Sequence, residues 1–371
     1  MITSMDFKVT TPEQTIWLTK NGSIEIIDQR HLPHQFVVEE ITSVASMCTA
    51  ISDMHVRGAP LLGVCGAFGM YLAVRESTKE ITRLYIEEVA QKIIATRPTA
   101  VNLAWGVQRA KELVLKNIAS KDLLEIVKNE ANRILDLDIA TCYSIGQHGL
   151  KLIEEISKEK GGKPVNILTH CNAGWLACVK YGTATSAIYL ADQKAIRVHV
   201  WVDETRPRNQ GASLTAWELK QAKIPHTIIA DNTGGHLMQN GMVDLVIVGT
   251  DRTARNGDVA NKIGTYLKAL AANDNKVPFY VALPSFSIDW SIKDGKQIPI
   301  EERDEREVKY ISGLIDGEIK EVLLTPAKSK ALNYGFDVTP ARLVTALITE
   351  RGICKASEEG LAKLFPEYQM Q

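Results

Sequence analysis

The stretch MVDLVIVGTDRTARNGDVANKIGT, residues 242–265, places many polar side chains directly after a short apolar run. The run VDLVIV is rich in β-branched residues, which indicates a buried strand. Asp251 is the first charged residue beyond that strand. The segment that follows predicts a helix beginning near Val259, with Asp258 as its N-cap, because aspartate is a favoured capping residue.

Asn261 and Lys262 are expected in the first turn of this helix, where their side chains can reach back toward the end of the strand. Capping accounts for Asp258, but it does not account for the other polar residues of the turn. We therefore expect Asp251, Asn261 and Lys262 to belong to one site.

The C-terminal part of the chain alternates apolar strands with helical segments, after a polar break at residues 158–164 (KEKGGKP). This rhythm is typical of a parallel sheet covered by helices on both faces, and ligands bind such sheets outside the carboxyl ends of the strands. The segment PARLVTALITERGICK, residues 340–355, predicts a final helix. The expected strands are VNILTH (165–170), IRVHVWVDE (196–204), HTIIAD (226–231), VDLVIVGTD (243–251) and VPFYVAL (277–283).

The N-terminal part has a different pattern. Residues 15–41 suggest short strands, and Asn21-Gly22 is the dipeptide that a type I′ hairpin turn prefers. From 42 to 157 the apolar residues recur at three- and four-residue spacing, which indicates helices. Because 371 residues exceed what one core usually serves, we predict two domains, 1–157 and 158–371. The predicted fold class is α/β, with a Rossmann-like parallel sheet after a helical domain that carries a small antiparallel sheet.

The composition excludes several classes of function. Lys and Arg number 43 against 44 Asp and Glu, a balance that argues against a nucleic-acid-binding protein. No apolar stretch is long enough to span a bilayer, and residues 1–14 do not have the pattern of a secretory signal. The six cysteines are scattered without zinc-type pairing, so we expect reduced thiols in a cytoplasmic protein. We also expect no metal and no nucleotide cofactor, because the chain lacks a glycine-rich dinucleotide fingerprint.

Cys171 directly follows the strand VNILTH and precedes the small-residue turn Asn172-Ala173-Gly174. A thiolate at the start of a helix is stabilised by the helix N-terminus, so Cys171 could act as a base or nucleophile. On composition alone a structural thiol is favoured for Cys171, and Cys178 is better explained in that way.

Two further strand ends carry polar groups. Arg206, Arg208 and Gln210 precede a helix start expected at Ser213, which suits either an anion or a solvated turn. The pair Gly234-Gly235 permits close approach of a ligand, or forms a tight turn.

Two segments of the helical part suggest an anion site. Arg57-Gly58-Ala59-Pro60 comes just before a long apolar helix, and proline suits a first helical turn. The backbone amides at that helix start could face a phosphate. Arg97 precedes Pro98 in a similar arrangement.

Seven segments together resemble the methylthioribose-1-phosphate isomerase family, sugar-phosphate isomerases of methionine salvage. The resemblance implies an N-terminal domain of helices and a small sheet, a Rossmann-like C-terminal domain and a homodimer. The matching segments are RGAP (57–60), RPTAVNL (97–103), THCNAG (169–174), ETRPRNQG (204–211), DNTGGHLM (231–238), GTDRTARNGDVANKIGT (249–265) and IPIEERDEREV (298–308).

The resemblance assigns the catalytic roles to Cys171 and Asp251. Thr250 departs from the alanine that is frequent in the family. The segment VALPSFSIDW, residues 281–290, looks more like a branch that acts on 5-deoxypentose 1-phosphates. The substrate-binding residues that the resemblance implies are Arg57, Gly58, Ala59, Arg97, Gln210, Asn261 and Lys262.

An aldose 1-phosphate cannot open to a free aldehyde, because phosphate blocks its anomeric oxygen. We assign Asp251, kept protonated, as the acid for the ring oxygen, and Cys171, as thiolate, as the base at C2. A direct hydride shift from C2 to C1 is the alternative. Arg57, Arg97 and Lys262 would bind the phosphate. Gln210 and Asn261 would hold sugar hydroxyls or phosphate oxygens.

Three other functions compete with this interpretation. Two of them are isomerases, for 5-deoxyribose 1-phosphate and for ribose 1,5-bisphosphate. The third is a non-catalytic protein, because the fold resembles the regulatory α, β and δ subunits of the eukaryotic translation-initiation nucleotide-exchange factor. The presence of both Cys171 and Asp251 favours an enzyme over a regulatory protein.

Overall fold

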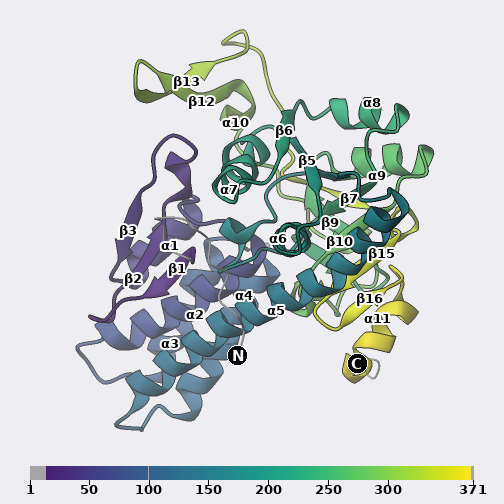
Figure 1. The fold of residues 1–371 in the computed structure, drawn as a ribbon. Coiled ribbons are helices and arrows are strands. Elements are labelled where there is room, and N and C mark those ends of the chain that lie inside the picture. Colours follow the sequence, from purple (N-terminus) through teal and green to yellow (C-terminus); the bar gives the residue numbers. More distant parts are fainter. Residues whose placement is uncertain (1–13, 99, 369–371) are drawn as a thin grey trace.

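A three-stranded antiparallel sheet opens the fold in the computed structural model, which describes residues 14–98 and 100–368 (Figure 1). Residues 1–13, on which the expectation of no secretory signal is based, lie outside the described residues. The strands pair in the order β1-β2-β3, as the apolar pattern predicts. Their bounds are β1 Ile16–Leu18, β2 Ile24–Ile27 and β3 Val38–Ile41.

The hairpin between β1 and β2 is confirmed, but its turn is not of type I′. Among the turn residues only Gly22 has a positive φ, at 84°, whereas type I′ requires positive φ at both central residues. The Thr19 amide donates to the Ser23 carbonyl and the Gly22 amide donates to the Thr19 carbonyl. These two bonds close a three-residue loop in which glycine takes the left-handed position.

Five helices follow, and the predicted helical region is confirmed. Helix α2 is buried along nearly its whole length, so the other helices pack around it. The helices are α1 Val44–Ser52, α2 Ala59–Glu76, α3 Arg83–Ala95, α4 Val101–Lys116 and α5 Leu123–Glu159.

The long helix α5 belongs to two hydrophobic cores. Its first half, including Val127 and Ile134, packs with the N-terminal helices, whereas Ile145 and Ile153 pack against the large sheet. We propose the division into units 1–157 and 158–371, with α5 as the element that joins their cores.

The large sheet has seven strands in the order β16-β15-β10-β7-β4-β5-β6. All are parallel except β16, which pairs antiparallel with β15 at one edge. The six parallel strands follow the chain order of a Rossmann fold, so the predicted fold class is confirmed. Their bounds are β4 Val165–Thr169, β5 Val198–Asp203, β6 His226–Ile229, β7 Leu245–Val248, β10 Phe279–Ala282, β15 Ala346–Thr349 and β16 Gly352–Cys354.

Helices cover both faces of this sheet. Alternate residues of β7 point to opposite faces: Leu245 and Ile247 pack on one side with α5 and α6, and Val246 and Val248 pack on the other side with α8 and α9. Both faces are therefore buried, as expected for a parallel sheet. The helices of this region are α6 Ser186–Gln193, α7 Ala216–Gln221, α8 Thr233–Gln239, α9 Thr265–Asp274 and α11 Glu358–Leu364.

The prediction of a helix from Val259 is wrong. Val259–Lys262 forms strand β9, and helix α9 begins only at Thr265, after Gly264 with φ of 103°. Asp258 caps no helix; its carboxylate accepts bonds from the amides of Gly295 and Ala341 instead. Pairing of β9 with β14 (Phe336–Thr339) over four residues overrides the local helical spacing.

The predicted helix over residues 340–355 is also wrong. The segment instead forms a short 3₁₀ turn at Ala341–Leu343 and then the edge hairpin of β15 and β16. Its apolar residues are spaced compatibly with either structure, and pairing of β15 with β10 selects the strand.

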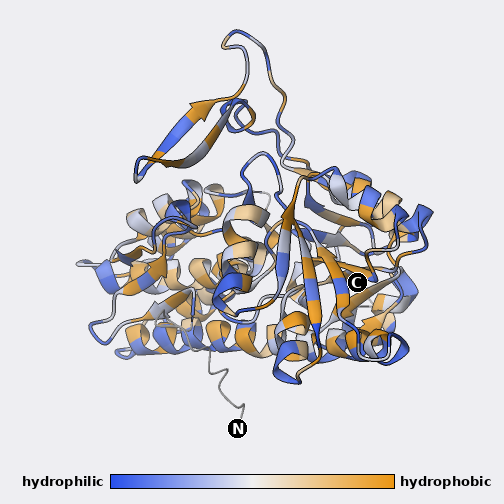
Figure 2. Cartoon of the chain, turned by 45° about the horizontal axis from the view of Figure 1, so that its top comes forward, coloured by the Kyte–Doolittle hydropathy of each residue, from blue (hydrophilic) through white to orange (hydrophobic). Residues whose placement is uncertain are grey.

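A second, smaller sheet with the order β11-β8-β9-β14 sits beside the carboxyl ends of the large one. The hairpin β12–β13 follows a one-turn helix, α10, and projects from the body of the molecule (Figures 1 and 2). None of the described helices is both long and apolar enough to cross a membrane. The bounds are β8 Arg252–Ala254, β9 Val259–Lys262, β11 Ile288–Asp289, β14 Phe336–Thr339, α10 Arg306–Lys309, β12 Tyr310–Ile315 and β13 Glu318–Leu323.

Candidate functional site

One cavity is lined by all nine residues that the sequence singles out as catalytic or substrate-binding. They come from segments that are far apart in the chain. The nine residues are Arg57, Gly58, Ala59, Arg97, Cys171, Gln210, Asp251, Asn261 and Lys262.

The cavity lies at the point where the strand order of the large sheet reverses. Strands β4 and β7 are neighbours in the sheet, but the chain proceeds from β4 to β5 on one side and from β7 to β10 on the other. The loops beyond the two strands therefore diverge and leave a crevice between them, the usual ligand position in this fold. Cys171 lies two residues beyond β4 and Asp251 three residues beyond β7.

The backbone of Cys171 is held in an unusual conformation, with φ of 66°. Its amide donates to Thr205 Oγ1 at 2.8 Å, and its carbonyl accepts from Thr215 Oγ1 at 2.7 Å. A non-glycine residue with positive φ persists only where its surroundings fix it, and such residues cluster at functional sites. These two hydroxyl contacts aim the Cys171 side chain into the cavity.

No α-helix starts directly after Cys171, so the predicted stabilisation of a thiolate by a helix N-terminus is wrong. The chain instead enters a 3₁₀ turn at Trp175–Ala177, and α6 begins only at Ser186. Burial raises the pKa of the Cys171 thiol, and the positive charges of Arg57 and Lys262 oppose that rise. Cys171 is therefore a neutral thiol at neutral pH.

The loop after Cys171 is clamped by one buried carboxylate, that of Glu218 in α7. Glu218 accepts bonds from the Asn172 side chain at 2.9 Å and from the backbone amides of Trp175 and Leu176 at 3.1 and 2.9 Å. The Tyr189 hydroxyl donates a fourth bond at 2.8 Å. Burial raises the pKa of Glu218, and these four donors favour its charged form.

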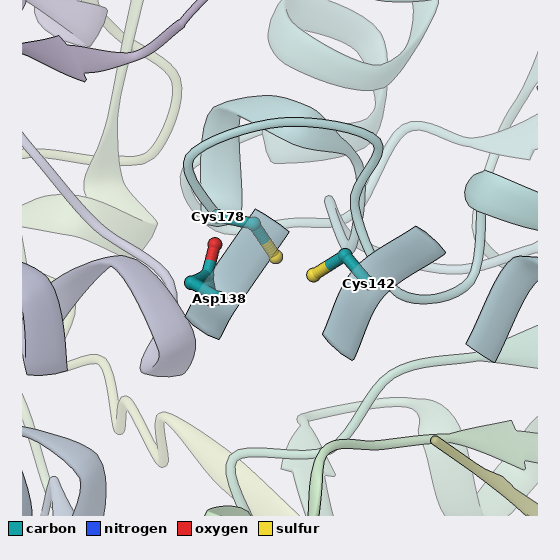
Figure 3. A group of neighbouring side chains, drawn as sticks. All are labelled: Asp138, Cys142 and Cys178. Carbon is teal, nitrogen blue, oxygen red and sulfur yellow. The ribbon is translucent and has the colours of Figure 1, made fainter. Parts of the chain in front are cut away.

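Cys178 packs in the core behind this loop. Its sulfur faces the sulfur of Cys142 on α5, and Asp138 lies beside them (Figure 3). The Val179 amide donates to the Asp138 carboxyl at 2.7 Å. Burial raises the pKa of Asp138 to about 7 and also raises the pKa of Cys178, whereas the pKa of Cys142 is raised first by its hydrogen bond with Cys178 and then by burial. Cys178 lines the same cavity as Cys171, but its sulfur faces a second thiol.

Three groups of potential metal ligands occur among the described residues. The group His170, Asp203 and Asp231 already has the ammonium of Lys268 beside Asp203 at 3.1 Å. In the group around Asp28, Arg30 binds the carboxylate at 2.7 Å. The third group is the buried set Asp138, Cys142 and Cys178, in which the pKa of both thiols is raised and that of Asp138 is raised to about 7.

Arg57 does not point freely into the cavity. Its guanidinium donates to the Asn172 side-chain oxygen at 2.7 Å and to the Asn172 carbonyl at 2.8 Å. It therefore braces the loop that carries Cys171 and places a positive charge near the thiol. This contact adds a positioning role to the phosphate contact expected from the sequence.

The N-terminus of α2 contributes backbone groups to the cavity. Gly58 is the N-cap, with φ of 99°, and Pro60 lies in the first turn as predicted. A Cβ atom at Gly58 would come within 2.5 Å of Ala177, so both the conformation and the packing require glycine. The first amides of this 18-residue helix, including that of Ala59, offer unpaired donors with a partial positive charge.

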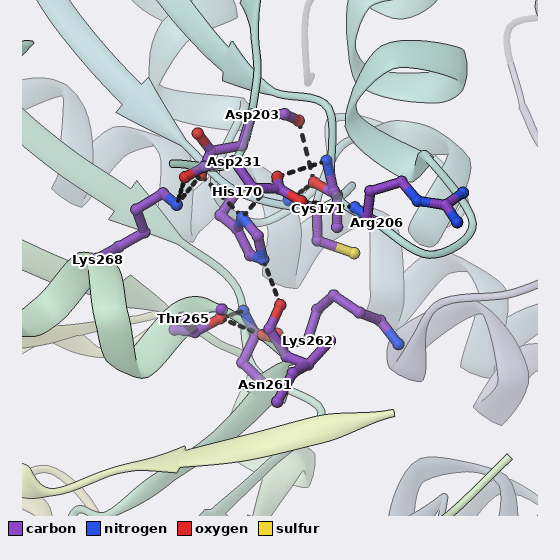
Figure 4. A network of polar contacts seen from close by, with 12 residues as sticks. His170, Cys171, Asp203, Arg206, Asp231, Asn261, Lys262, Thr265 and Lys268 are labelled. Atoms are coloured by element: carbon purple, nitrogen blue, oxygen red, sulfur yellow. Dashed lines mark hydrogen bonds and ion pairs between the residues drawn. The ribbon is translucent and has the colours of Figure 1, made fainter. Parts of the chain in front are cut away.

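Arg97 and Lys262 bring positive charge to the same cavity. The Nε and Nη1 atoms of Arg97 are buried and have no hydrogen-bond partner among the described residues. Burial lowers the pKa of Lys262 to about 8, and the neighbouring Arg303 acts in the same direction. Lys262 Nζ donates to the Gly335 carbonyl at 2.7 Å, and Figure 4 shows Lys262 and Cys171 extending toward the same side.

Arg303 and Phe336 also line the cavity, and the sequence-based selection missed both. Lys262 Nζ lies 4.5 Å from the ring centroid of Phe336, and the Arg303 guanidinium carbon lies 5.2 Å from it. Arg303 belongs to the motif IPIEERDEREV, which contains several charged residues with no feature to separate them. Phe336 had no signal, because its segment was not recognised as a strand.

The polar side chains of Gln210 and Asn261 complete the set. Gln210 is buried and its Oε1 has no partner among the described residues. Asn261 donates to Thr265 Oγ1 at 3.0 Å. Asp251 is fixed by its own backbone, since its amide donates to the Ala260 carbonyl at 2.9 Å.

The arginines just before Gln210 face elsewhere. Arg206 donates to the Val308 carbonyl at 2.7 Å, and Arg208 pairs with Glu307 at 2.8 Å, so both hold the base of the β12–β13 hairpin. The pair Gly234-Gly235 lies inside α8 and does not line the cavity. The two arginines are thus bound within the protein rather than forming a solvated turn, and the glycine pair is helical rather than part of a tight turn.

A second pocket opens beside Asp251 and Arg97, which line both cavities. The wall of this side pocket is mostly apolar. Its apolar residues outside the main cavity are Leu62, Ala100, Ala260, Ile298, Pro299 and Ile300.

Comparison with known proteins shows the family to which this chain belongs. The model of the initiation factor 2 subunit family matches residues 55–356. A methylthioribose-1-phosphate isomerase of Desulfatibacillum aliphaticivorans is 59% identical over 358 residues, which cover 95% of this chain and 97% of that protein. One from Paramagnetospirillum magneticum is 57% identical over 362 residues, or 96% of this chain and 98% of that protein.

Two solved structures are each 36% identical to the chain. The 5-methylthioribose 1-phosphate isomerase of Pyrococcus horikoshii has a TM-score of 0.83 over 98% of this chain and 100% of that one. A protein described as the delta subunit of translation initiation factor eIF-2B from A. fulgidus has a TM-score of 0.78 over 96% of this chain and 100% of that one. The chain thus belongs to the initiation factor 2 subunit family, in which its similarity to methylthioribose-1-phosphate isomerases extends over nearly its full length.

Proposed function

We propose that this protein is an aldose–ketose isomerase that converts 5-methylthioribose 1-phosphate to 5-methylthioribulose 1-phosphate in methionine salvage. The observation that carries the proposal is the meeting of Cys171 and Asp251 in one cavity with several cationic groups. The curated relatives at 57–59% identity carry the corresponding name. A regulatory subunit, the rival from another class, would have no need for this combination of thiol, carboxyl and cations.

The phosphate is bound by groups that lack protein partners. Arg97 has two buried nitrogens without acceptors among the described residues, and the first amides of α2 offer further donors. Lys262 adds a positive charge whose lowered pKa reflects its burial beside Arg303. A phosphate dianion among these groups would satisfy the donors and relieve the repulsion between the cations.

Ring opening is the step assigned to Asp251. The C1 oxygen carries the phosphate, so the bond between C1 and the ring oxygen must break while that oxygen receives a proton. Asp251 follows β7 in a fixed backbone position and faces the same cavity as the cations. Its carboxyl group delivers the proton to the ring oxygen as a general acid.

Cys171 is assigned to the hydrogen transfer from C2 to C1. Because burial favours the neutral thiol, Cys171 must first lose its proton, and the charges of Arg57 and Lys262 favour that loss. The thiolate then removes the C2 proton, which leaves an enol, and the resulting thiol returns a proton to C1. The C2 hydroxyl loses its proton as the C2 ketone forms, and the Asp251 carboxylate accepts that proton and is restored as the acid. A hydride shift is the alternative that needs no thiolate, and the two routes differ in whether solvent hydrogen enters C1 of the ketose.

The side pocket favours an apolar substituent at C5 of the sugar. Its mostly apolar wall suits a methylthio group. Arg252 also lines this pocket, but its guanidinium lies 3.5 Å from the Asp289 carboxylate and is thus already paired with an anion. The pocket favours 5-methylthioribose or 5-deoxyribose 1-phosphate over ribose 1,5-bisphosphate. Between the first two, the larger substituent fills more of the pocket.

For the oligomeric state we propose a homodimer in which the β12–β13 hairpin contacts a second copy. A two-stranded ribbon is at best marginally stable alone. Leu314 on β12 and Leu323 on β13 lie on the same face of this hairpin and are 52% and 39% exposed. We retain the cytoplasm as the proposed location, which the six free thiols support.

The pH dependence of phosphate binding tests Lys262. Its charge is present below its pKa of about 8 and is lost as the pH rises through that value. Affinity for inorganic phosphate, measured by calorimetry, should therefore fall between about pH 7 and about pH 9.5, whereas Lys262→Arg should retain its affinity because arginine stays charged. The expected loss is about 1.5–3 kcal/mol, the range for a bond to a charged group. If the phosphate affinity of the wild type changes with pH in the same way as that of Lys262→Arg, then Lys262 does not bind the phosphate.

Asp251→Asn tests the acid. Asparagine preserves shape but cannot deliver a proton, so turnover should fall at least ~100-fold while substrate binding changes little. The matched control is Asp244→Asn near the opposite end of the same strand, where the carboxylate binds Lys160 and the Asn166 amide. Steady-state kinetics and direct binding of both variants are compared. Near-normal turnover by Asp251→Asn would show that another group protonates the ring oxygen.

A turnover comparison of 5-methylthioribose, 5-deoxyribose and ribose 1-phosphates with ribose 1,5-bisphosphate tests the substrate. We expect the highest kcat/KM for the methylthio sugar, and Ile298→Ser should reduce that preference by roughly 10–200-fold, the range for a lost apolar contact. The exposed Ile228 supplies the control variant Ile228→Ser. A preference for the bisphosphate would overturn the assignment, and no turnover of any of the four would favour the regulatory protein.

Sedimentation equilibrium tests the dimer. The wild type should sediment as a dimer at micromolar concentration, and the double variant Leu314→Asp with Leu323→Asp should sediment as a monomer, because two charges on this face oppose its burial. Leu84→Asp, at a leucine that is 64% exposed on α3, should leave the dimer intact. A monomeric wild type would contradict the proposal.

A further inference from the structure

The imidazole of His170 joins two separate segments of the candidate site. Its Nδ1 lies 2.8 Å from Asp203 Oδ2 at the end of β5, and its Nε2 lies 2.9 Å from the Ile263 carbonyl (Figure 4). His170 precedes Cys171 in the chain, and Ile263 follows Lys262. The ring therefore links the segment that carries the thiol to the segment that carries a cation.

Both neighbours of the ring are hydrogen-bond acceptors. A carbonyl oxygen cannot donate, and Asp203, which also has the Lys268 ammonium 3.1 Å away, is placed to act as an ionised carboxylate. A neutral imidazole carries a proton on only one nitrogen, so it would leave one of these two acceptors unpaired. The imidazolium form satisfies both.

The charges around the ring favour the same form. Asp231 Oδ1 lies 4.0 Å from His170 Nδ1, and the Asp337 carboxylate interacts electrostatically with His170. With Asp203, three carboxylates thus lie near two ammonium groups, that of Lys268 beside Asp203 and that of Lys262 near Asp337. A third cation within this group compensates the remaining negative charge, and a positively charged His170 supplies it.

The ring is packed so tightly that it can transmit a displacement. His170 is fully buried, and a Cβ atom built on Gly264 would lie 3.1 Å from its Cε1 atom. Gly264 forms the left-handed turn that connects β9 to α9, and its amide donates to Asp337 at 2.7 Å. The turn beyond Lys262 therefore rests directly on the imidazole and has little freedom to shift.

We propose that His170 is a positioning residue of the isomerase, a buried imidazolium that fixes the Cys171 thiol relative to Lys262. The inference rests on the proposed function, and it adds a residue that neither the motif assignments nor the proposed chemistry uses. His170 acts through Cys171 and Lys262: one segment holds the base near C2 and the other holds the phosphate. Their separation decides whether a bound sugar phosphate is aligned for reaction.

The proposal predicts a loss in kcat rather than in binding. Misplacement of a reacting group by about 1 Å can cost about 100-fold in rate while the bound state is kept. His170→Asn keeps an amide near the position of Nδ1, so it retains the contact with Asp203 but loses the contact with Ile263. His170→Gln extends an amide toward the position of Nε2 and retains the contact with Ile263.

We expect His170→Asn to lower kcat by about 100-fold with a KM within a few-fold of that of the wild type. His170→Gln should recover a substantial part of that loss, because it restores the contact between the two segments. The control is Tyr71→Phe, which removes a hydrogen bond to the Gly22 carbonyl in the N-terminal core, far from the site. Its kcat should match that of the wild type, so a general loss of stability is distinguishable from misplacement.

Nitrogen NMR of the histidine rings tests the charge without using activity. Both ring nitrogens of His170 should carry protons, because each of them faces a hydrogen-bond acceptor. A bare ring nitrogen at neutral pH, or equal kcat for the wild type and both His170 variants, would overturn the proposal. If the wild type fails to isomerise any aldose 1-phosphate, the proposed function fails, whereas the NMR result still decides the charge of His170. If His170→Asn does not fold, His170→Gln and the wild-type NMR still provide both outcomes.

Discussion

The candidate site depends on the parallel pairing of β4 with β7. The register places Ile167 beside Leu245 and Leu168 beside Val246, so the two strands end at the same edge of the sheet. Because the chain turns to opposite sides after these strands, their loops separate and a crevice forms. A shift of this register by one residue would point every side chain of a strand to the other face. Both faces are buried, and such a shift would therefore disrupt two cores as well as the site.

The crevice concentrates positive charge in a buried place, which is costly without an anion. Arg97, Lys262 and Arg303 lie together, and burial lowers the pKa of both Arg97 and Lys262. The surrounding structure keeps this arrangement: Arg57 is bound to Asn172, and Glu218 holds the loop beyond Cys171. Rigid backbone segments thus hold unpaired hydrogen-bond donors around a cavity that suits one small anionic ligand.

The sequence predicted much of this arrangement. Runs such as VNILTH and VDLVIV identify buried strands from their apolar, β-branched residues alone, and the rule for parallel sheets places the polar residues after them at one edge. Two predictions failed for a common reason. The apolar spacing in residues 259–262 and 340–355 suits either a helix or a strand. Pairing of the first segment with β14 and of the second with β10, both elsewhere in the chain, selects the strand. Non-local pairing of this kind has no local signal.

The residues of the site show the same division. Cys171 and Asp251 stand out because each is a polar group at the end of an apolar run. Phe336 belongs to an unrecognised strand, and the role of His170 depends on a carbonyl that is 93 residues away in the chain. The expected helix after Cys171 is absent. The positive charges that favour the Cys171 thiolate therefore come from the side chains of Arg57 and Lys262 rather than from a helix N-terminus.

The central claim is that β4 and β7 present Cys171 and Asp251 to one sugar phosphate. A crystal structure of the Cys171→Ser variant with 5-methylthioribose 1-phosphate tests it most directly. The account predicts the phosphate among Arg97, Lys262 and the first amides of α2, the ring oxygen within hydrogen-bond distance of Asp251, and C2 facing residue 171. A sugar phosphate bound with its ring oxygen away from Asp251, or outside this cavity, would contradict the account.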